Sequence, residues 1–236
     1  MKKLASSLNS TLEGMTGLRL QPSADTRLSK FRSHILSKNG IETVIDVGAN
    51  EGQFGKRLRH SGYKGVISSF EPSPAFDSLR QVARKDPKWN VFNLALGSKK
   101  AVGEMNLASN GNLSSSLKRP TGILNEFQLK FQPGFSVKVE RLDDVVTLNK
   151  MSYLKLDVQG FEWEVLEGAH ETMKQLLAIE FESALSPLYE GERTFVELDA
   201  LLRRSGFIAA LIAPTHWSRV GELLSLDSIY VREVLS

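Results

Sequence analysis

The sequence predicts an α/β fold of the doubly wound, Rossmann-like type, in which helices cover both faces of a mostly parallel sheet. From Thr43 onward, short apolar runs alternate with amphipathic segments of helical periodicity. Runs that are apolar on both faces and alternate with helices are typical of parallel strands buried between two helical layers. A glycine-rich turn after the first run predicts a ligand site at the carboxyl edge of this sheet.

Seven strands are expected, at residues 44–47, 66–70, 91–96, 153–158, 176–181, 207–212 and 228–231. The last two follow each other without a clear helix, which predicts a hairpin and an antiparallel strand at the sheet edge. Residues 97–150 interrupt the alternation with two further short strands around a polar stretch. This insertion either elaborates the surface or faces a substrate.

The chain divides into an N-terminal helical extension, residues 1–40, and a main domain, residues 41–236. Leucines at helical spacing near the start predict a short amphipathic helix, and a second helix is expected over Thr26–Lys38, ended by Asn39 and Gly40. The extension either packs over the main domain or caps a substrate or membrane surface.

Composition narrows the classes of function. The 236 residues suit one large domain, and 30 basic against 27 acidic residues give no strong field for nucleic acid. The absence of cysteine excludes disulfides, thiolate nucleophiles and zinc–thiolate sites. No apolar stretch approaches 18 residues, so we expect a cytoplasmic protein with at most peripheral membrane contact.

The turn after the first strand, in TVIDVGANEGQFG, carries Asp46, Gly48, Asn50 and Gly52. Glycines let the backbone approach a ligand closely, but the pattern is not the G-x-G-x-x-G of dinucleotide-binding turns. The acidic residues Asp46 and Glu51 would repel a pyrophosphate, whereas they suit the ammonium and sulfonium groups of S-adenosylmethionine.

A second acidic residue follows at the next strand end. Glu71, in SSFEPSP, lies 25 residues after Asp46, where a carboxylate can accept hydrogen bonds from both ribose hydroxyls of a nucleoside. Pro72 adjoins it. Asn93 and Ala95, expected at the end of the third strand, are placed to meet the adenine edge.

Several segments carry a resemblance to a known family: VIDVGANEGQFG, SSFEPSPAF, WNVFNLALG, NLSSSL, RLDDV, LKLDVQGFEWEVLEGA and ESALSPLYEGE. With these the chain resembles the FkbM family of methyltransferases from about Thr43 to Arg232. The resemblance implies a class I methyltransferase fold and S-adenosylmethionine as methyl donor. It also implies a hydroxyl acceptor on a small molecule, sugar or glycoconjugate, and therefore an O-methyltransferase.

Methyl transfer to an alcohol needs alignment of the acceptor and a group that takes its proton. Asp157, in YLKLDVQGFE, ends the strand expected beside the first and is the leading candidate for the base, facing the methyl donor. Glu180 and Glu182 share one face of the next strand, and Glu182 is expected to orient the acceptor. An alternative is that these glutamates and Asp157 hold a divalent cation. His216, expected in a loop, is a further candidate base or acceptor ligand.

Other assignments stay open at this point. Ser114–Ser116 and Asn112 either line the acceptor pocket or form a polar surface loop. A nucleic-acid methyltransferase is the first alternative, but amino methyltransferases of that class carry a [DN]-P-P-[FYW] turn where this chain reads Asp-Val-Gln-Gly. A catalytically inactive protein that binds S-adenosylmethionine is the second, and a nucleotide-dependent oxidoreductase is the third.

Overall fold

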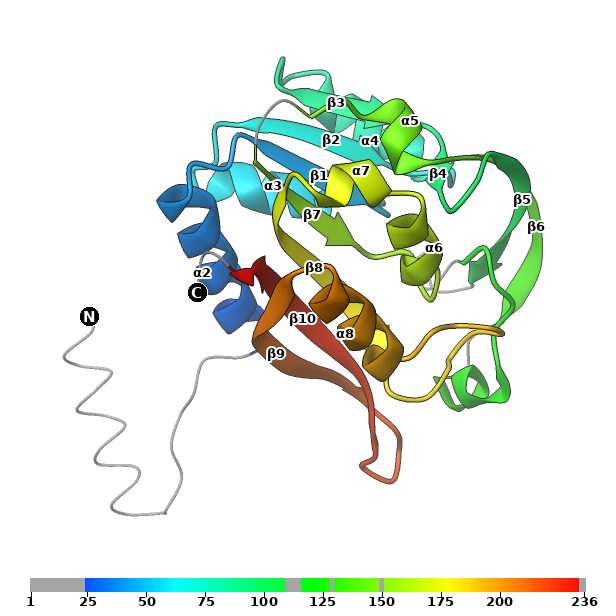
Figure 1. The fold of residues 1–236 in the computed structure, drawn as a ribbon. Helices are drawn as coiled ribbons and strands as arrows, with labels where there is room; N and C mark the ends of the chain where they lie inside the picture. The colour runs from blue at the N-terminus through cyan, green and yellow to red at the C-terminus, as the bar shows by residue number, and fades with distance from the viewer. Residues whose placement is uncertain (1–23, 109–115, 128–129, 149–150, 234–236) are drawn as a thin grey trace, which may run out of the picture.

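The computed structural model describes residues 24–108, 116–127, 130–148 and 151–233. One sheet of seven strands dominates it, in the order β3-β2-β1-β7-β8-β10-β9 (Figure 1). The bounds are β1 Thr43–Val47, β2 Val66–Phe70, β3 Trp89–Phe92, β7 Ser152–Leu156, β8 Leu176–Ala184, β9 Phe207–Trp217 and β10 Leu223–Arg232. All pairs are parallel except those of β10, which runs antiparallel to β8 and β9. The predicted fold class, including the closing hairpin at the sheet edge, is confirmed.

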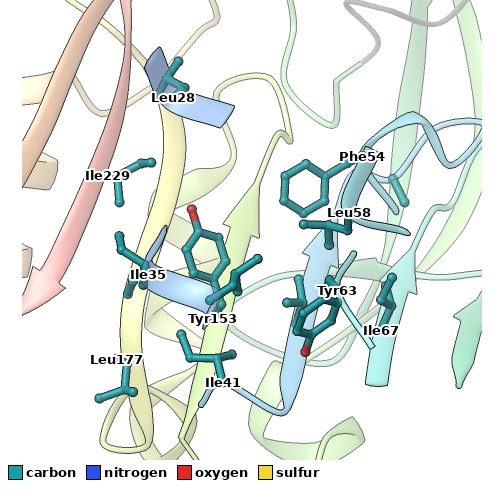
Figure 2. Close-up of a cluster of buried hydrophobic side chains, with 14 of the residues drawn as sticks. Leu28, Ile35, Ile41, Phe54, Leu58, Tyr63, Ile67, Tyr153, Leu177 and Ile229 are labelled. Atoms are coloured by element: carbon teal, nitrogen blue, oxygen red, sulfur yellow. The ribbon is translucent and has the colours of Figure 1, made fainter. Parts of the chain in front are cut away.

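Two helical layers cover the sheet. Side chains of α2 (Ala24–Lys38), α3 (Gln53–His60) and α4 (Phe76–Ala83) share one apolar cluster with one face of the strands. Figure 2 shows Leu28 and Ile35 of α2 beside Tyr153 and Ile229, with Phe54 and Leu58 of α3 alongside. The other face packs against α5 (Leu142–Val145), α6 (Glu162–Glu167), α7 (His170–Met173) and α8 (Phe195–Arg204).

The helix expected at residues 26–38 is confirmed as α2, which contributes to the core of the main domain through Leu28, Ile35 and Leu36. The shorter helix expected near the N-terminus lies outside the described residues. The division of the chain at residue 40 therefore stays a prediction. Among the described residues, no helix is both long and apolar enough to cross a membrane.

The third predicted strand is wrong. Residues 91–96 do not form one strand, because β3 ends at Phe92 and the chain then leaves the main sheet. The side-chain amide of Asn93 donates to the carbonyl of Glu71 (3.0 Å), in place of the backbone N–H that a continuing strand would supply. Ala95 and Leu96 form β4, which pairs with a second sheet made with β6 (Phe131–Glu140) and β5 (Ala101–Ala108).

Polar residues replace apolar ones toward the carboxyl ends of the strands, on the face that α2, α3 and α4 cover. In β1, Val44 gives way to Asp46; in β7, Tyr153 gives way to Lys155. Because alternate residues of a strand share a face, each polar side chain lies directly beyond an apolar one. The sheet therefore presents a buried apolar floor and a polar carboxyl edge.

Candidate active site

A cavity of about 250 Å³ opens at the carboxyl ends of β1, β2 and β7. Of the donor-site residues predicted from the sequence, seven line it: Asp46, Gly48, Asn50, Glu71, Pro72, Ala95 and Asp157. The edge between parallel strands and their following helices is where doubly wound folds bind ligands. The structure thus brings most of the predicted set to one place.

Three predicted positions lie elsewhere. Gly52 is the N-cap of α3 and does not line the cavity. Asn93 also lies outside the lining, and its side-chain amide donates a hydrogen bond to the backbone carbonyl of Glu71. Glu51 is exposed and outside the lining, so the carboxylates that accompany Asp46 there are Glu71 and Asp157.

The glycine turn is held close to the end of β7. Gly48 has a φ of 80°, and a Cβ built there would lie 1.9 Å from the carbonyl oxygen of Asp157. Any side chain at this position would collide with backbone as well as strain it. Gly48 therefore lets the donor-side turn and the strand end that carries Asp157 approach each other.

Glu71 is fixed by backbone groups. One carboxylate oxygen accepts the N–H of Asn50 (2.7 Å) and the other accepts the N–H of Ser73 (2.8 Å), and the residue is only 7% exposed. Each carboxylate oxygen has lone pairs beyond the one that these bonds use. Glu71 thus faces the cavity in one orientation with acceptor capacity left for a ligand.

Asp46 is 1% exposed and accepts a hydrogen bond from the Ser69 hydroxyl (3.0 Å). Burial raises its pKa to about 7, against the opposing effects of Ser69 and Lys155. A carboxyl group with this pKa changes charge near neutral pH. Burial thus favours the neutral form of Asp46, and its carboxyl group gains negative charge as the pH rises through the neutral range.

Asp157 follows β7 and has a side chain that is 46% exposed. The ammonium group of Lys155 donates to one of its oxygens (3.3 Å), and the amide of Gln159 donates to the other (3.0 Å). The Lys155 ammonium also donates to the carbonyl of Leu156 (3.0 Å). Burial opposes the charged form of Lys155, but the carboxylates led by Asp157 outweigh it and raise the pKa of that lysine.

The two glutamates of β8 share a face, as predicted, yet differ in their partners. The guanidinium of Arg32, from α2, donates to both oxygens of Glu180 at 2.6 Å, and Tyr153 also donates to it. Glu180 is 2% exposed. Glu180 is held inside the core by these bonds and does not line the cavity, so of the two glutamates Glu182 is the one that stays a candidate for the acceptor.

Glu182 lies beyond Glu180, beside the position of Asp157, since Leu156 pairs with Phe181 in the preceding row. Its carboxylate accepts the Ser225 hydroxyl (2.8 Å) and contacts Nδ1 of His216 (3.0 Å). Burial works to raise the pKa of Glu182, but these hydrogen bonds outweigh it and lower the pKa below its usual value.

His216 is in strand β9 and not in a loop, because β9 continues to Trp217 and pairs His216 with Ser225 of β10. Its hydrogen bond with Glu182 raises the pKa of the imidazole, against the effect of burial. The ring side chain is more than half exposed. The pair of predicted residues Glu182 and His216 thus forms one hydrogen-bonded unit on the far side of Asp157.

Sequence reasoning missed three charged residues of this edge. Arg57 of α3 and Lys155 of β7 both line the cavity, and Lys155 contacts Asp157. Asp227 precedes the strand predicted at residues 228–231, but it belongs to β10 and pairs with Glu182. Burial raises the pKa of Asp227 to about 7. The signal for Lys155 was a lysine with apolar neighbours inside a buried strand, which is costly unless it is paired.

The sequence matches the model of the methyltransferase FkbM domain over residues 46–209. The chain belongs to the FkbM methyltransferase family. Two curated relatives are the 2-O-methyltransferase NoeI of Sinorhizobium fredii, 29% identical over 63% of this chain and 66% of that protein, and the methyltransferase sdnD of Sordaria araneosa, 28% identical over 70% and 73%. The chain thus spans just under two thirds of the length of NoeI.

Among solved structures, an rRNA methylase from Streptococcus thermophilus is 12% identical, covers 90% of this chain and 98% of its own, and gives a TM-score of 0.50. At this identity the likeness extends to the fold alone. It agrees with the class I methyltransferase architecture of this FkbM-family enzyme.

The insertion of this FkbM methyltransferase contributes to the cavity. Met105 of β5, Ser116 and Leu117 all line it, so the segment faces the site rather than only elaborating the surface. Of the polar residues proposed for an acceptor pocket, Ser116 is described and buried, while Asn112, Ser114 and Ser115 lie outside the described residues.

In the part of the chain that the structure describes, no group of three or more histidines or carboxylates is arranged to hold a metal ion. The divalent cation suggested as an alternative has no ligand set there, since Glu180 is committed to Arg32.

Proposed function

We propose that this FkbM methyltransferase transfers a methyl group from S-adenosylmethionine to a hydroxyl oxygen of a small molecule, sugar or glycoconjugate. The observation that carries the proposal is a partly exposed carboxylate, Asp157, beside a cavity lined by a glycine turn and the backbone-held Glu71. The Asp157 carboxylate suits proton removal, and the glycine turn with Glu71 suits a nucleoside.

The residues present fit an adenosyl donor. Glu71 offers acceptor positions for ribose hydroxyls, and Pro72, Leu94 and Ala95 give an apolar wall beside it on which an adenine can pack. The acidic residues of the lining, Asp46, Glu71 and Asp157, outnumber its basic residues, Arg57 and Lys155, and this balance favours a cationic ligand over a pyrophosphate. When bound, the donor supplies a methyl carbon made electrophilic by a sulfonium sulfur.

The chain's own residues then orient the acceptor and handle one proton. We assign Asp157 as the group that accepts the hydroxyl proton as the oxygen–carbon bond forms and the carbon–sulfur bond breaks. The products are a methyl ether, the neutral thioether and a protonated carboxyl group. A positioned base contributes about 10²–10⁴-fold to such a step.

Glu182 and His216 are assigned to the acceptor. They lie on the side of Asp157 away from the donor cavity, and Glu182 pairs with Asp227 in the neighbouring strand. Carboxylates and an imidazole recognise neutral hydroxyl groups by hydrogen bonds. The name of NoeI, a 2-O-methyltransferase, supports a hydroxyl acceptor, and the modest overall charge supports one that is not nucleic acid.

The test incubates the purified chain with S-adenosylmethionine and panels of polyols, oligosaccharides and hydroxylated macrolides. We expect S-adenosylhomocysteine to form together with an acceptor that is heavier by about 14 Da, because a methyl group replaces one hydrogen. Methylated RNA or DNA in a parallel panel, with no methyl ether in the first, would favour the nucleic-acid alternative. Donor binding with no product in any panel would favour an inactive binding protein.

A further inference from the structure

The turn that follows Asp157 contains a hydrogen-bonded chain of side chains that the function above does not use. Gln159 donates from its amide nitrogen to Oδ1 of Asp157 (3.0 Å), while Lys155 donates to Oδ2 (3.3 Å). Lys155 precedes Asp157 in the chain and Gln159 follows it, so the two donors approach the carboxylate from different segments. An exposed carboxylate would otherwise rotate between several rotamers, so these two bonds select one orientation of Asp157.

The orientation of the Gln159 amide is itself set by Tyr189. The Tyr189 hydroxyl donates to the amide oxygen of Gln159 at 3.1 Å. Burial raises the pKa of Tyr189, so its hydroxyl stays protonated and available as a donor. Because the Asp157 carboxylate only accepts hydrogen bonds, the amide nitrogen of Gln159 is the end that faces it. The Tyr189 hydroxyl donates to the opposite end of the amide and so holds the Gln159 side chain in this position.

Tyr189 is held in place by the glycine that follows Gln159. Gly160 has a φ of 88°, and a Cβ there would lie 2.8 Å from Cδ2 of Tyr189, so the ring packs directly on the backbone. Tyr189 is 2% exposed. Its ring therefore has one position against the turn.

The backbone of Gln159 is also constrained. Its φ of 53° lies in the left-handed region, which is uncommon for a residue other than glycine and persists only where surrounding contacts enforce it. The buried Ser116 hydroxyl donates to the Gln159 carbonyl at 2.6 Å. Ser116 comes from the insertion, so a segment more than 40 positions away in sequence holds this turn.

We propose that Gln159 is a positioning residue that holds the Asp157 carboxylate toward the acceptor, and that Tyr189 and Ser116 hold Gln159. The inference rests on the proposed role of Asp157 as proton acceptor. Misplacement of a catalytic group by about 1 Å costs up to about 100-fold in rate. Gln159 lines the cavity next to Asp157, but its side-chain hydrogen bonds go to Asp157 and Tyr189, so we expect loss of the amide to act mainly on turnover.

The first experiment compares Gln159→Met, which keeps the side-chain length and removes the amide, with Gln81→Met on the exposed surface of α4. Gln159→Met is expected to lower kcat about 10- to 100-fold with the dissociation constant of S-adenosylmethionine within about twofold of wild type. Gln81→Met leaves both unchanged. Equal kcat values in the two variants would overturn the proposal.

Two further variants separate positioning from a structural role. Gln159→Gly removes the side chain and relieves the left-handed backbone, so its Tm is expected to equal or exceed that of wild type while kcat falls as in Gln159→Met. Tyr189→Phe removes only the hydroxyl and is expected to lower kcat about three- to tenfold, since the Gln159 side chain then loses the bond that holds its amide oxygen in place. If Gln159→Gly loses Tm and keeps kcat, the residue is structural.

A double mutant ties the effect to Asp157. If Gln159 acts through that carboxylate, Gln159→Met in an Asp157→Asn background causes no further loss of kcat. Multiplication of the two losses would contradict the proposal. Full activity of Asp157→Asn alone would instead refute the proposed function, so the two failures are distinguishable.

Discussion

The two sides of the carboxyl edge are built in different ways. On the donor side, Glu71 is held by backbone N–H groups of Asn50 and Ser73. On the acceptor side, Glu182 is held by side chains of His216 and Ser225, from two other strands. The donor side depends on local turn geometry, while the acceptor side depends on long-range packing. A backbone-built site needs only the strand ends, so it tolerates changes in the residues that contact an acceptor.

The largest expected effect separates the two sides through Asp157, which lies between them. Asp157→Asn keeps the shape and removes the base, so we expect kcat to fall about 10²–10⁴-fold, while donor affinity, which loses one nearby negative charge, falls by no more than about tenfold. Steady-state kinetics and calorimetry measure the two quantities, with the exposed Asp77→Asn as control. A fall in donor affinity as large as the fall in kcat would mean that Asp157 acts in donor binding alone.

Arg32→Met tests whether Glu180 belongs to the framework or to the acceptor side. Removing one partner of a buried ion pair leaves the other charge buried and unpaired, so we expect the free energy of unfolding to fall by about 3–5 kcal/mol. Denaturant titration measures this. Arg203→Met, which breaks an exposed i,i+4 pair with Asp199, is expected to cost only about 0.5 kcal/mol. Similar losses in both variants would contradict the buried-pair interpretation.

Donor affinity is expected to depend on pH through Asp46. Its pKa of about 7 makes it neutral at pH 6 and charged at pH 8, and a negative floor favours a cationic donor. We therefore expect the dissociation constant of S-adenosylmethionine to be up to about tenfold larger at pH 6 than at pH 8. Calorimetry at both pH values checks this, and Asp46→Asn should abolish the difference. A wild-type dissociation constant that is equal at both pH values argues against the role.

The smallest effect concerns His216 and stability. Its folded-state pKa is raised by Glu182, so the pair stabilises the fold fully below pH 6.5 and loses this contribution as pH rises through the folded-state value. The stability advantage of wild type over His216→Asn should be larger at pH 5.5 than at pH 9, by at most about 1 kcal/mol because the ring is exposed. A larger advantage at pH 9 would reverse the assigned coupling.

The same contrast explains what the sequence could predict. The seven-strand sheet and the residues of the glycine turn and Glu71 follow from local signals: apolar runs, turn glycines and strand ends. Even there, the exit of the chain from the main sheet after Phe92 was not predicted, because the apolar pattern continues through Leu94, Ala95 and Leu96.

On the acceptor side, the sequence predicted which types of residue are present but not which residues they bond to. Glu180 and Glu182 look equivalent in sequence, and only the position of α2 commits Glu180 to Arg32. The same holds for Asp227, which the register of β10 brings beside Glu182, and for Gln159, which Tyr189 orients. Such contacts join residues distant in sequence, so single-sequence periodicity carries no signal for them.

The most direct measurement of the central claim is calorimetric titration of S-adenosylmethionine into wild type, Glu71→Gln and Glu182→Gln, with melting curves to verify folding. We expect one site per chain in wild type, a loss of about 10- to 100-fold in affinity for Glu71→Gln, as for a hydrogen bond to a charged group, and unchanged affinity for Glu182→Gln. No binding to wild type, or equal affinity in folded Glu71→Gln, would contradict the assignment of this cavity to the adenosyl donor.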